Sequence, residues 1–176
     1  DSGLFVSNFQ TLNTGFGGTY VNVQAGDGGE ALEAAGPNTA TLFIGGAGND
    51  TMTGSLAADA YDLTKGGQNI VQGSVEQLDQ DTIVGFTPDD TLKFLDVQFG
   101  LDDLTVTMGS AILEVDVDGD GVTDSTVTLE GDFSQAQFQV VQEGGNSLIT
   151  VEQPQPDGGD EGDGGDGGGR HAVGQE

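Results

Sequence analysis

The chain has 176 residues, and its 30 acidic residues against three Lys or Arg give a formal charge of −27 at pH 7. This charge argues against nucleic acid and anionic lipid as partners, because contact with either needs a basic face. The chain has no cysteine, which excludes disulfides and thiolate metal sites, and no run approaches the ~18 apolar residues of a membrane-spanning helix, so membrane insertion is not expected. Because like charges destabilise a compact state, we expect bound divalent cations to relieve the repulsion.

Residues 1–35 are predicted to form an irregular N-terminal β cap. Two short apolar pieces, Leu4–Val6 and Tyr20–Val23, are separated by glycine-rich turns such as residues 14–18, which is typical of short strands. Residues 30–35 have the composition of one helical turn. So short a segment is not a stable helix by propensity alone, and an irregular coil is the alternative.

A nine-residue period begins at residue 36. Glycine recurs at positions 36, 45 and 54, and large apolar side chains recur at Phe43, Met52, Tyr61 and Ile70. A repeat that buries one large residue in every nine, and reverses direction between them, stacks into a flattened solenoid with the apolar ladder inside. Residues 36–80 are therefore predicted to form a short β-roll.

The stretch 45–53, G-G-A-G-N-D-T-M-T, combines glycines with one carboxylate. The glycines allow backbone angles closed to other residues and bring carbonyl oxygens inward, and Asp50 adds a charged oxygen. Crowded oxygens suit a hard cation, so we predict calcium ligands at Gly46, Gly48, Asp50 and, in the next frame, Asp59. The metal-free alternative is a glycine-rich hairpin turn with Asp50 at its tip.

Residues 81–95 are predicted to form a hairpin, two strand-like runs joined by the turn Pro88–Asp90. The open end of a solenoid exposes strand edges and apolar interior, so a capping element is required after the repeats. Asp81 and Asp90 are candidate ligands, and the favoured alternative is that they cap turns.

A second candidate site follows an alternating segment, Leu104–Met108, that predicts a half-buried strand. Six residues match places 1, 3, 5, 6, 7 and 9 of the loop used by EF-hand-type calcium sites; in order they are Asp116, Asp118, Asp120, Gly121, Val122 and Asp124. The match ends at Val127, which stands where a bidentate Glu belongs, and strands flank the loop. The alternative is a metal-free turn with solvent-facing carboxylates. Because neighbouring carboxylates repel one another unless a cation lies among them, we favour the metal.

Two further strands, Gln137–Gln142 and Ser147–Glu152, complete an antiparallel β region over residues 81–152. Residues 153–176 are predicted to be a disordered tail, because residues 157–169 are only Asp, Glu and Gly. The single histidine, His171, lies in this tail, which excludes Ser-His-Asp or Cys-His catalysis and His-ligated zinc inside the fold. The chain also has no Trp and two Tyr, which argues against a carbohydrate-cleaving cleft. We expect no enzymatic activity.

Residues 36–152 resemble the calcium-binding domains of RTX (hemolysin-type) proteins. The stretch 45–53 fits the repeat G-G-x-G-x-D-x-U-x of that family at every fixed place. The pattern D-x-I-x-G-F-x-P-x-D-x-L-x-F over residues 81–94 is similar to the segment that closes the roll in secreted members. The resemblance implies an all-β protein, in which a short calcium-binding parallel β-roll is followed by an antiparallel, sandwich-like cap.

The same resemblance implies a function. Such domains belong to bacterial proteins exported by type I secretion, stay unfolded in the calcium-poor cytoplasm, and fold outside, where calcium is about millimolar. We therefore expect a non-catalytic calcium-binding module, secreted or at the cell surface, that supports secretion and stability. The alternative is a surface-structural or adhesive subunit whose calcium sites hold further copies of the chain, another protein or carbohydrate.

Overall fold

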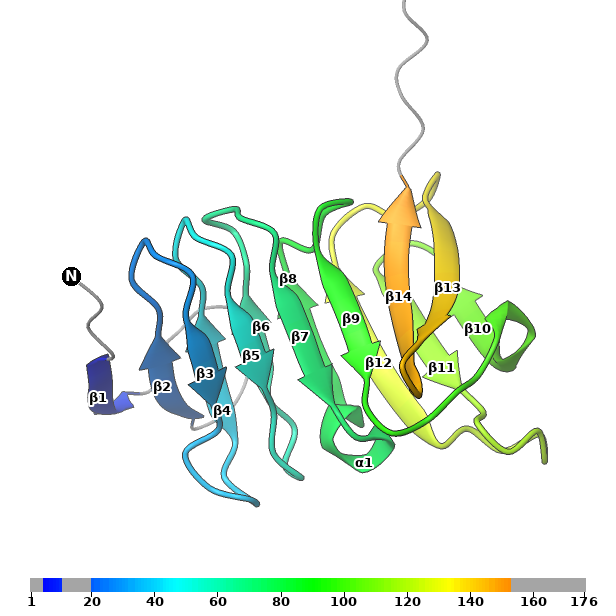
Figure 1. Cartoon of the computed structure of the whole chain (residues 1–176), viewed down its shortest axis with the longest axis horizontal. Helices are drawn as coiled ribbons and strands as arrows, with labels where there is room; N and C mark the ends of the chain where they lie inside the picture. Colours follow the sequence, from blue (N-terminus) through cyan, green and yellow to red (C-terminus); the bar gives the residue numbers. More distant parts are fainter. Residues whose placement is uncertain (1–4, 11–19, 153–176) are drawn as a thin grey trace, which may run out of the picture.

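The computed structural model describes residues 5–10 and 20–152, and these residues are almost entirely β (Figure 1). The predicted tail of residues 153–176 and the predicted turn of residues 14–18 lie outside the described residues. Two sheets, one of eight strands and one of six, face each other across the core. Among the described residues, the helical elements are one turn of α-helix, α1 (Val75–Leu78), and a 3-10 turn, η1 (Leu101–Asp103).

The strands are named here in their spatial order. The eight-stranded sheet contains β1 (Phe5–Gln10), β2 (Tyr20–Gln24), β4 (Thr41–Ile44), β6 (Ala60–Asp62), β8 (Asp81–Val84), β12 (Ser125–Glu130), β11 (Ala111–Val115) and β10 (Leu104–Thr107). The six-stranded sheet contains β13 (Gln137–Glu143), β14 (Asn146–Glu152), β9 (Thr91–Phe94), β7 (Ile70–Gly73), β5 (Thr51–Thr53) and β3 (Ala31–Glu33).

From β2 to β9 the chain alternates between the two sheets, so each successive pair of strands makes one coil of a flattened solenoid. Neighbours are parallel throughout this stretch, β2–β4–β6–β8 in the larger sheet and β3–β5–β7–β9 in the smaller. The predicted all-β fold with stacked parallel coils is confirmed. The stack begins at Tyr20, because β2 and β3 already pair with the coil that follows them.

Two rows of apolar side chains fill the space between the sheets. The rows are Val23, Phe43, Tyr61 and Ile83 from the larger sheet, and Leu32, Met52, Val71 and Leu92 from the smaller, all at most 3% exposed. In-register pairing lays each side chain on the one before it, and the rings of Phe43 and Tyr61 stack with centroids 4.9 Å apart and an interplanar angle of 4°. The predicted ladder members Phe43, Met52 and Tyr61 are therefore in the core, and they come alternately from opposite sheets.

The predicted ladder is wrong at Ile70. Val71 is fully buried and pairs with Met52, whereas Ile70 is only half-buried and pairs with Thr51 on the outer face of the sheet. Nine residues separate Met52 from Tyr61, but ten separate Tyr61 from Val71. The extra residue lies in a turn with Gly66 and Gly67 at φ +88° and +94°. One added residue moves the buried position by one place, because a strand's side chains alternate between its two faces.

Residues 30–35 are not helical. Ala31–Glu33 is strand β3, paired in parallel with β5, so the pairing decides a conformation that local propensity leaves open. Its central residue, Leu32, begins the buried row of the smaller sheet and is 1% exposed.

The predicted hairpin over residues 81–95 is also wrong. Its two runs are β8 and β9, which lie in different sheets and form the last parallel coil. The sequence pattern strand–turn–strand is the same in a hairpin and in a solenoid coil. The two differ in which strands pair with each other, and the pattern does not show this.

The stack is closed by later strands. On the larger sheet β12 adds in parallel to β8, and β11 and β10 follow antiparallel; on the smaller sheet β14 and β13 follow β9 antiparallel. The predicted strand at residues 104–108 and the hairpins over residues 111–130 and 137–152 are confirmed. The core continues into this cap through Leu113, Leu129, Phe138 and Ile149, all buried.

Substitution of Met52 and Ile70 tests the register. Met52→Ala should lower the free energy of unfolding by about 2–5 kcal/mol, the usual cost of truncating a fully buried large side chain. Ile70→Ala should cost clearly less, because this side chain stays partly in solvent. Urea unfolding measures both, and equal losses would contradict the observed register.

Candidate cation sites and the acceptor ladders

A ladder of buried acceptors runs along the edge where the strands of the smaller sheet begin. The backbone N–H of Glu30 donates to Asp50 Oδ1 at 2.9 Å, that of Asp50 to Asn69 Oδ1 at 3.0 Å, and that of Asn69 to Asp90 Oδ1 at 2.9 Å. Each side chain thus accepts the N–H of the residue in the same place one coil earlier. We call Glu30, Asp50, Asn69 and Asp90 the six-strand ladder.

The opposite edge, where the strands of the larger sheet begin, carries a matching ladder. Thr41 N–H donates to Asp59 Oδ1 at 2.6 Å, and Asp59 N–H donates to Asp81 Oδ1 at 2.7 Å. We call Thr41, Asp59 and Asp81 the eight-strand ladder. Asp50 and Asp59, both predicted as calcium ligands, therefore lie on opposite edges of the solenoid and not in one site.

The second oxygen of several ladder carboxylates holds the turn that leads into its own strand. Gly46 N–H donates to Asp50 Oδ2 at 2.8 Å, Ser55 N–H to Asp59 Oδ2 at 2.5 Å, and Thr87 N–H to Asp90 Oδ2 at 2.9 Å. Turn capping, the favoured interpretation of Asp90, is confirmed. Asp81 differs in its second partner, because its Oδ2 accepts the hydroxyl of Tyr61 at 3.1 Å.

Burial raises the pKa values of the two carboxyl groups in the eight-strand ladder. Removal from water raises the pKa of Asp81 from 3.8 to about 8; the hydrogen bond from the Asp59 N–H opposes this rise, and the negative charge of Asp59 adds to it. Burial also raises the pKa of Asp59, against the lowering effect of the N–H groups of Ser55 and Thr41. Burial, with the charges of Asp81 and Asp59, raises the pKa of Tyr61 well above its usual value.

The predicted glycine ligands lie where two turns are in close contact. A Cβ on Gly46 would come within 1.4 Å of the carbonyl oxygen of Gly26, and one on Gly48 within 1.5 Å of that of Gly28. Neither Gly46 nor Gly48 has a positive φ. Glycine is therefore needed here for close backbone approach and not for left-handed angles, and the carbonyl groups of one turn point at the next.

Glu30 is a residue of this site that the sequence reasoning missed. Its Oε2 atom is buried without a hydrogen-bond partner. Burial raises the pKa of Glu30, and so do the close approach of the Asp50 carboxyl and the negative charges of Asp50 and Asp27. The signal was present in residues 25–33, A-G-D-G-G-E-A-L-E, which fit the nine-residue frame with Ala in the first place, Glu in the sixth and Leu in the eighth.

The donor set at this turn pair suits calcium. The carboxylates of Glu30 and Asp50 and the carbonyls of the stacked turns are all oxygen, the ligand type that a hard cation takes. A carboxylate has about four lone-pair positions, so Asp50 retains acceptor capacity beside its two N–H partners.

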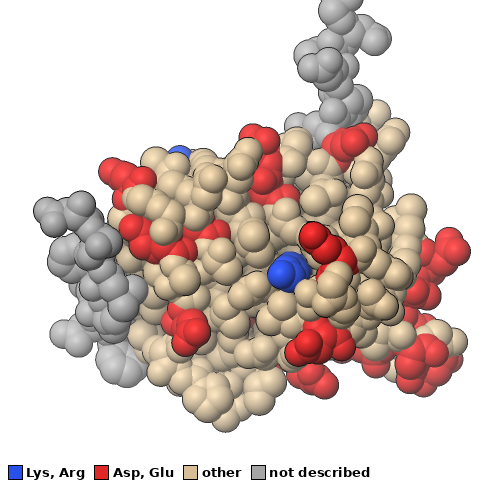
Figure 2. Space-filling view, in the orientation of Figure 1, with Lys and Arg blue, Asp and Glu red and all other residues tan. Residues whose placement is uncertain are grey.

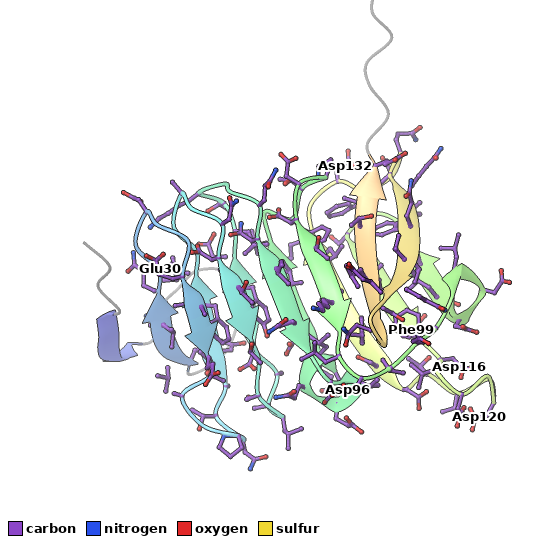
Figure 3. The ribbon with its side chains drawn as sticks, in the orientation of Figure 1. Glu30, Asp96, Phe99, Asp116, Asp120 and Asp132 are labelled. Carbon is purple, nitrogen blue, oxygen red and sulfur yellow. The ribbon has the colours of Figure 1, made fainter. Side chains whose placement is uncertain are left out.

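The second predicted site is a loop that projects from the β11–β12 hairpin at the far end of the molecule from Glu30 (Figure 3). Oxygens of Asp116, Asp118 and Asp120 lie within 4.8 Å of one another. The N–H groups of Gly119 and Gly121 donate to the two oxygens of Asp116, each at 2.8 Å, and both glycines have positive φ.

The remaining predicted members of the loop lie around this cluster. Val122 is 63% exposed, and its N–H donates to Asp120 Oδ1 at 2.8 Å. Asp124 Oδ2 accepts the N–H of Val117 at 2.8 Å, which ties the two ends of the loop together. Three carboxylates of one loop therefore converge in solvent, and the set of oxygen donors fits calcium.

No protein-family model matches the chain, and no curated protein gives a significant match. Within the described residues, no helix has both the length and the apolar character needed to cross a membrane.

The adjacent residues Asp89 and Asp90 give a charge-matched test of the ladder. Asp90→Asn replaces one acceptor oxygen by a donor NH2 group and leaves a buried N–H of Asn69 or Thr87 unpaired, at a cost of about 1–3 kcal/mol. Asp89→Asn removes the same charge at an exposed position, so its unfolding free energy should stay near that of the wild type. If the two variants unfold at the same urea concentration, the ladder does not carry the stability assigned to it.

The raised pKa of Asp81 predicts that the free energy of unfolding depends on pH. Its folded-state pKa of about 8 lies above the ordinary 3.8, so its contribution to stability is fully present below about pH 4 and is lost as pH rises to about 8. Asp81→Asn imitates the neutral acid and should flatten this part of the profile, whereas Asp89→Asn should retain the wild-type slope. The check is to measure the urea midpoint of unfolding of all three proteins at several values between about pH 5 and about pH 8. If the midpoint changes with pH equally in all three, the prediction is contradicted.

Proposed function

We propose that the chain is a non-catalytic calcium-binding module that folds when calcium binds, as part of an exported bacterial protein. The observation that carries the proposal is the convergence of Asp116, Asp118 and Asp120 within 4.8 Å. Like charges at such distances repel, and a divalent cation among them turns the repulsion into attraction. These three carboxylates, with the main chain at Val122, would hold the ion.

The Glu30–Asp50 turn pair supports a second ion. Here the unpartnered Oε2 of Glu30 lies beside a second carboxylate, an arrangement that costs free energy in the absence of a cation. Gly46 and Gly48 bring the two turns close enough for their oxygens to act together. Asp59, enclosed by N–H donors at the opposite edge, is a weaker candidate than the sequence suggested.

Calcium binding of this kind has a large effect on folding. An ion that binds only the folded state stabilises it by about 2.7 kcal/mol when present at a hundred times its dissociation constant. Small domains have total stabilities of about 5–15 kcal/mol, so two sites supply a substantial share. A module of this type stays open where calcium is scarce and closes outside the cell, which supports type I export and extracellular stability, as in the RTX proteins that the sequence resembles.

Far-UV circular dichroism tests the proposal directly. The protein should show a β spectrum in millimolar calcium and mostly coil in chelator, because the unneutralised carboxylates oppose the compact state. A spectrum that does not change between the two buffers would reject calcium-dependent folding.

Charge-neutral variants separate the two sites. Asp118→Asn can still accept the N–H of Asp120 but loses its charge, so the calcium midpoint should rise by about tenfold, which is about 1.4 kcal/mol. Glu30→Gln should be more stable than the wild type in chelator and gain less from calcium, because its repulsion with Asp50 is removed. Asp89→Asn is the control for loss of one exposed charge, and a midpoint shift as large as that of Asp118→Asn would refute the assignment of the loop.

A further inference from the structure

A polar groove of about 380 Å³ crosses the outer face of the six-stranded sheet where β5, β7 and β9 begin. Its walls are formed by Asn49, Thr51, Gln68, Ile70, Asp89 and Thr91, and ladder residues Asp50 and Asn69 lie at its base. Of the residues that line the groove, only the buried Asp50 also belongs to a proposed calcium site.

The ladder itself creates the groove. Asp50, Asn69 and Asp90 turn inward, so the residues immediately before and after each of them turn outward. The residues after them, Thr51, Ile70 and Thr91, are direct partners across three strands. The residues before them form a second, parallel row at the turns. The groove therefore runs across the strands, along the solenoid axis, with neighbouring positions about 4.8 Å apart.

The polar groups of the groove are not used inside the protein. Within the described part of the chain, four polar side chains of the groove make no hydrogen bond. They are the amide of Gln68, the hydroxyls of Thr51 and Thr91, and the carboxylate of Asp89. Asn49 uses its Oδ1 to accept the N–H of Gln68 at 2.9 Å, which leaves its NH2 group free. Amides and hydroxyls both donate and accept, so together they suit a ligand that also does both.

The charge of the molecule narrows the ligand class. An anion is disfavoured by the net charge of −27 and by Asp89 inside the groove. Of the two carboxylates in the lining, Asp50 is 1% exposed and accepts two N–H groups, so Asp89 alone is open to a ligand and does not by itself select a metal cation. An apolar ligand would leave the amides and hydroxyls unpaired. Figure 2 shows more acidic than basic groups on this face, which adds to the repulsion of an anion. A neutral ligand rich in hydroxyl groups meets all of these conditions.

We propose that this groove binds a neutral saccharide chain, with its hydroxyls on Gln68, Asn49, Thr51 and Thr91 and an apolar ring face on Ile70. Asp89 accepts a hydroxyl at one end. Because the groove repeats with the coils, it takes a linear chain laid along the solenoid axis. The proposal needs the folded chain but not the calcium sites.

NMR titration of the full chain, kept folded in millimolar calcium, tests the proposal. The probes are oligosaccharides of glucose, mannose and galactose, with an oligoglucuronate as the anionic comparison. At least one neutral probe should shift the signals of Gln68 and Thr91. Gln68→Ala and Thr91→Val should each weaken that binding by about five- to tenfold, the loss expected for a hydrogen bond.

Matched controls lie on other surfaces. Gln139→Ala removes an exposed amide from β13, and Thr128→Val removes a hydroxyl from β12 in the other sheet; both should bind as the wild type does. A β spectrum for each variant shows that it is folded and separates failure of the groove from failure of calcium-dependent folding. The proposal is overturned if folded protein binds none of the neutral probes, binds oligoglucuronate in preference, or binds equally well in Gln68→Ala and Thr91→Val.

Discussion

The hydrogen bond between a backbone N–H at the start of one strand and a short acceptor side chain one coil further on is the interaction on which this solenoid depends. These N–H groups are enclosed by the stack, and a buried donor without a partner costs about 1–3 kcal/mol. Asp50, Asp59, Asn69, Asp81 and Asp90 supply the missing oxygens. Since each acceptor faces inward, the residue two places later also faces inward and becomes the core residue, as Met52 follows Asp50.

The ladders divide the acidic residues into two groups with different tasks. The four aspartates of the ladders, Asp50, Asp59, Asp81 and Asp90, are at most 2% exposed and accept N–H or O–H donors. Their cost is one of burial, which is seen in the raised pKa values of Asp59 and Asp81. The carboxylates of Asp118 and Asp120 are exposed, each accepts one N–H of the loop, and their oxygens lie within 4.8 Å of each other and of Asp116. Net charge therefore does not reveal where a cation binds. The candidate positions are those where several carboxylates converge and keep acceptor capacity, as at Glu30 and in the loop after β11.

The sequence predicts the repeating part of the fold well because one local rule governs it. The spacing of Phe43, Met52 and Tyr61 indicates the coil, and it fails at Ile70 only because one turn is longer. The first coil escaped notice because Ala25 and Glu30 stand in the places of Gly and Asp. The local sequence does not show whether Asp50 is a calcium ligand or a hydrogen-bond acceptor, because both roles need a carboxylate at the same place. The N–H group that Asp50 accepts belongs to Glu30, which lies 20 residues away.

Native-state hydrogen exchange of the ladder amides tests the central claim most directly. The ladder amides lie just before or at the first residue of a strand, and amides at the ends of strands ordinarily exchange fast. The amides to follow are those of Glu30, Thr41, Asp50, Asp59 and Asn69. If inter-coil acceptors hold them, they exchange as slowly as the amides of Met52 and Tyr61 in the strands, through opening of the whole stack. Exchange as fast as that of the exposed turn residue Ala47 would contradict the account.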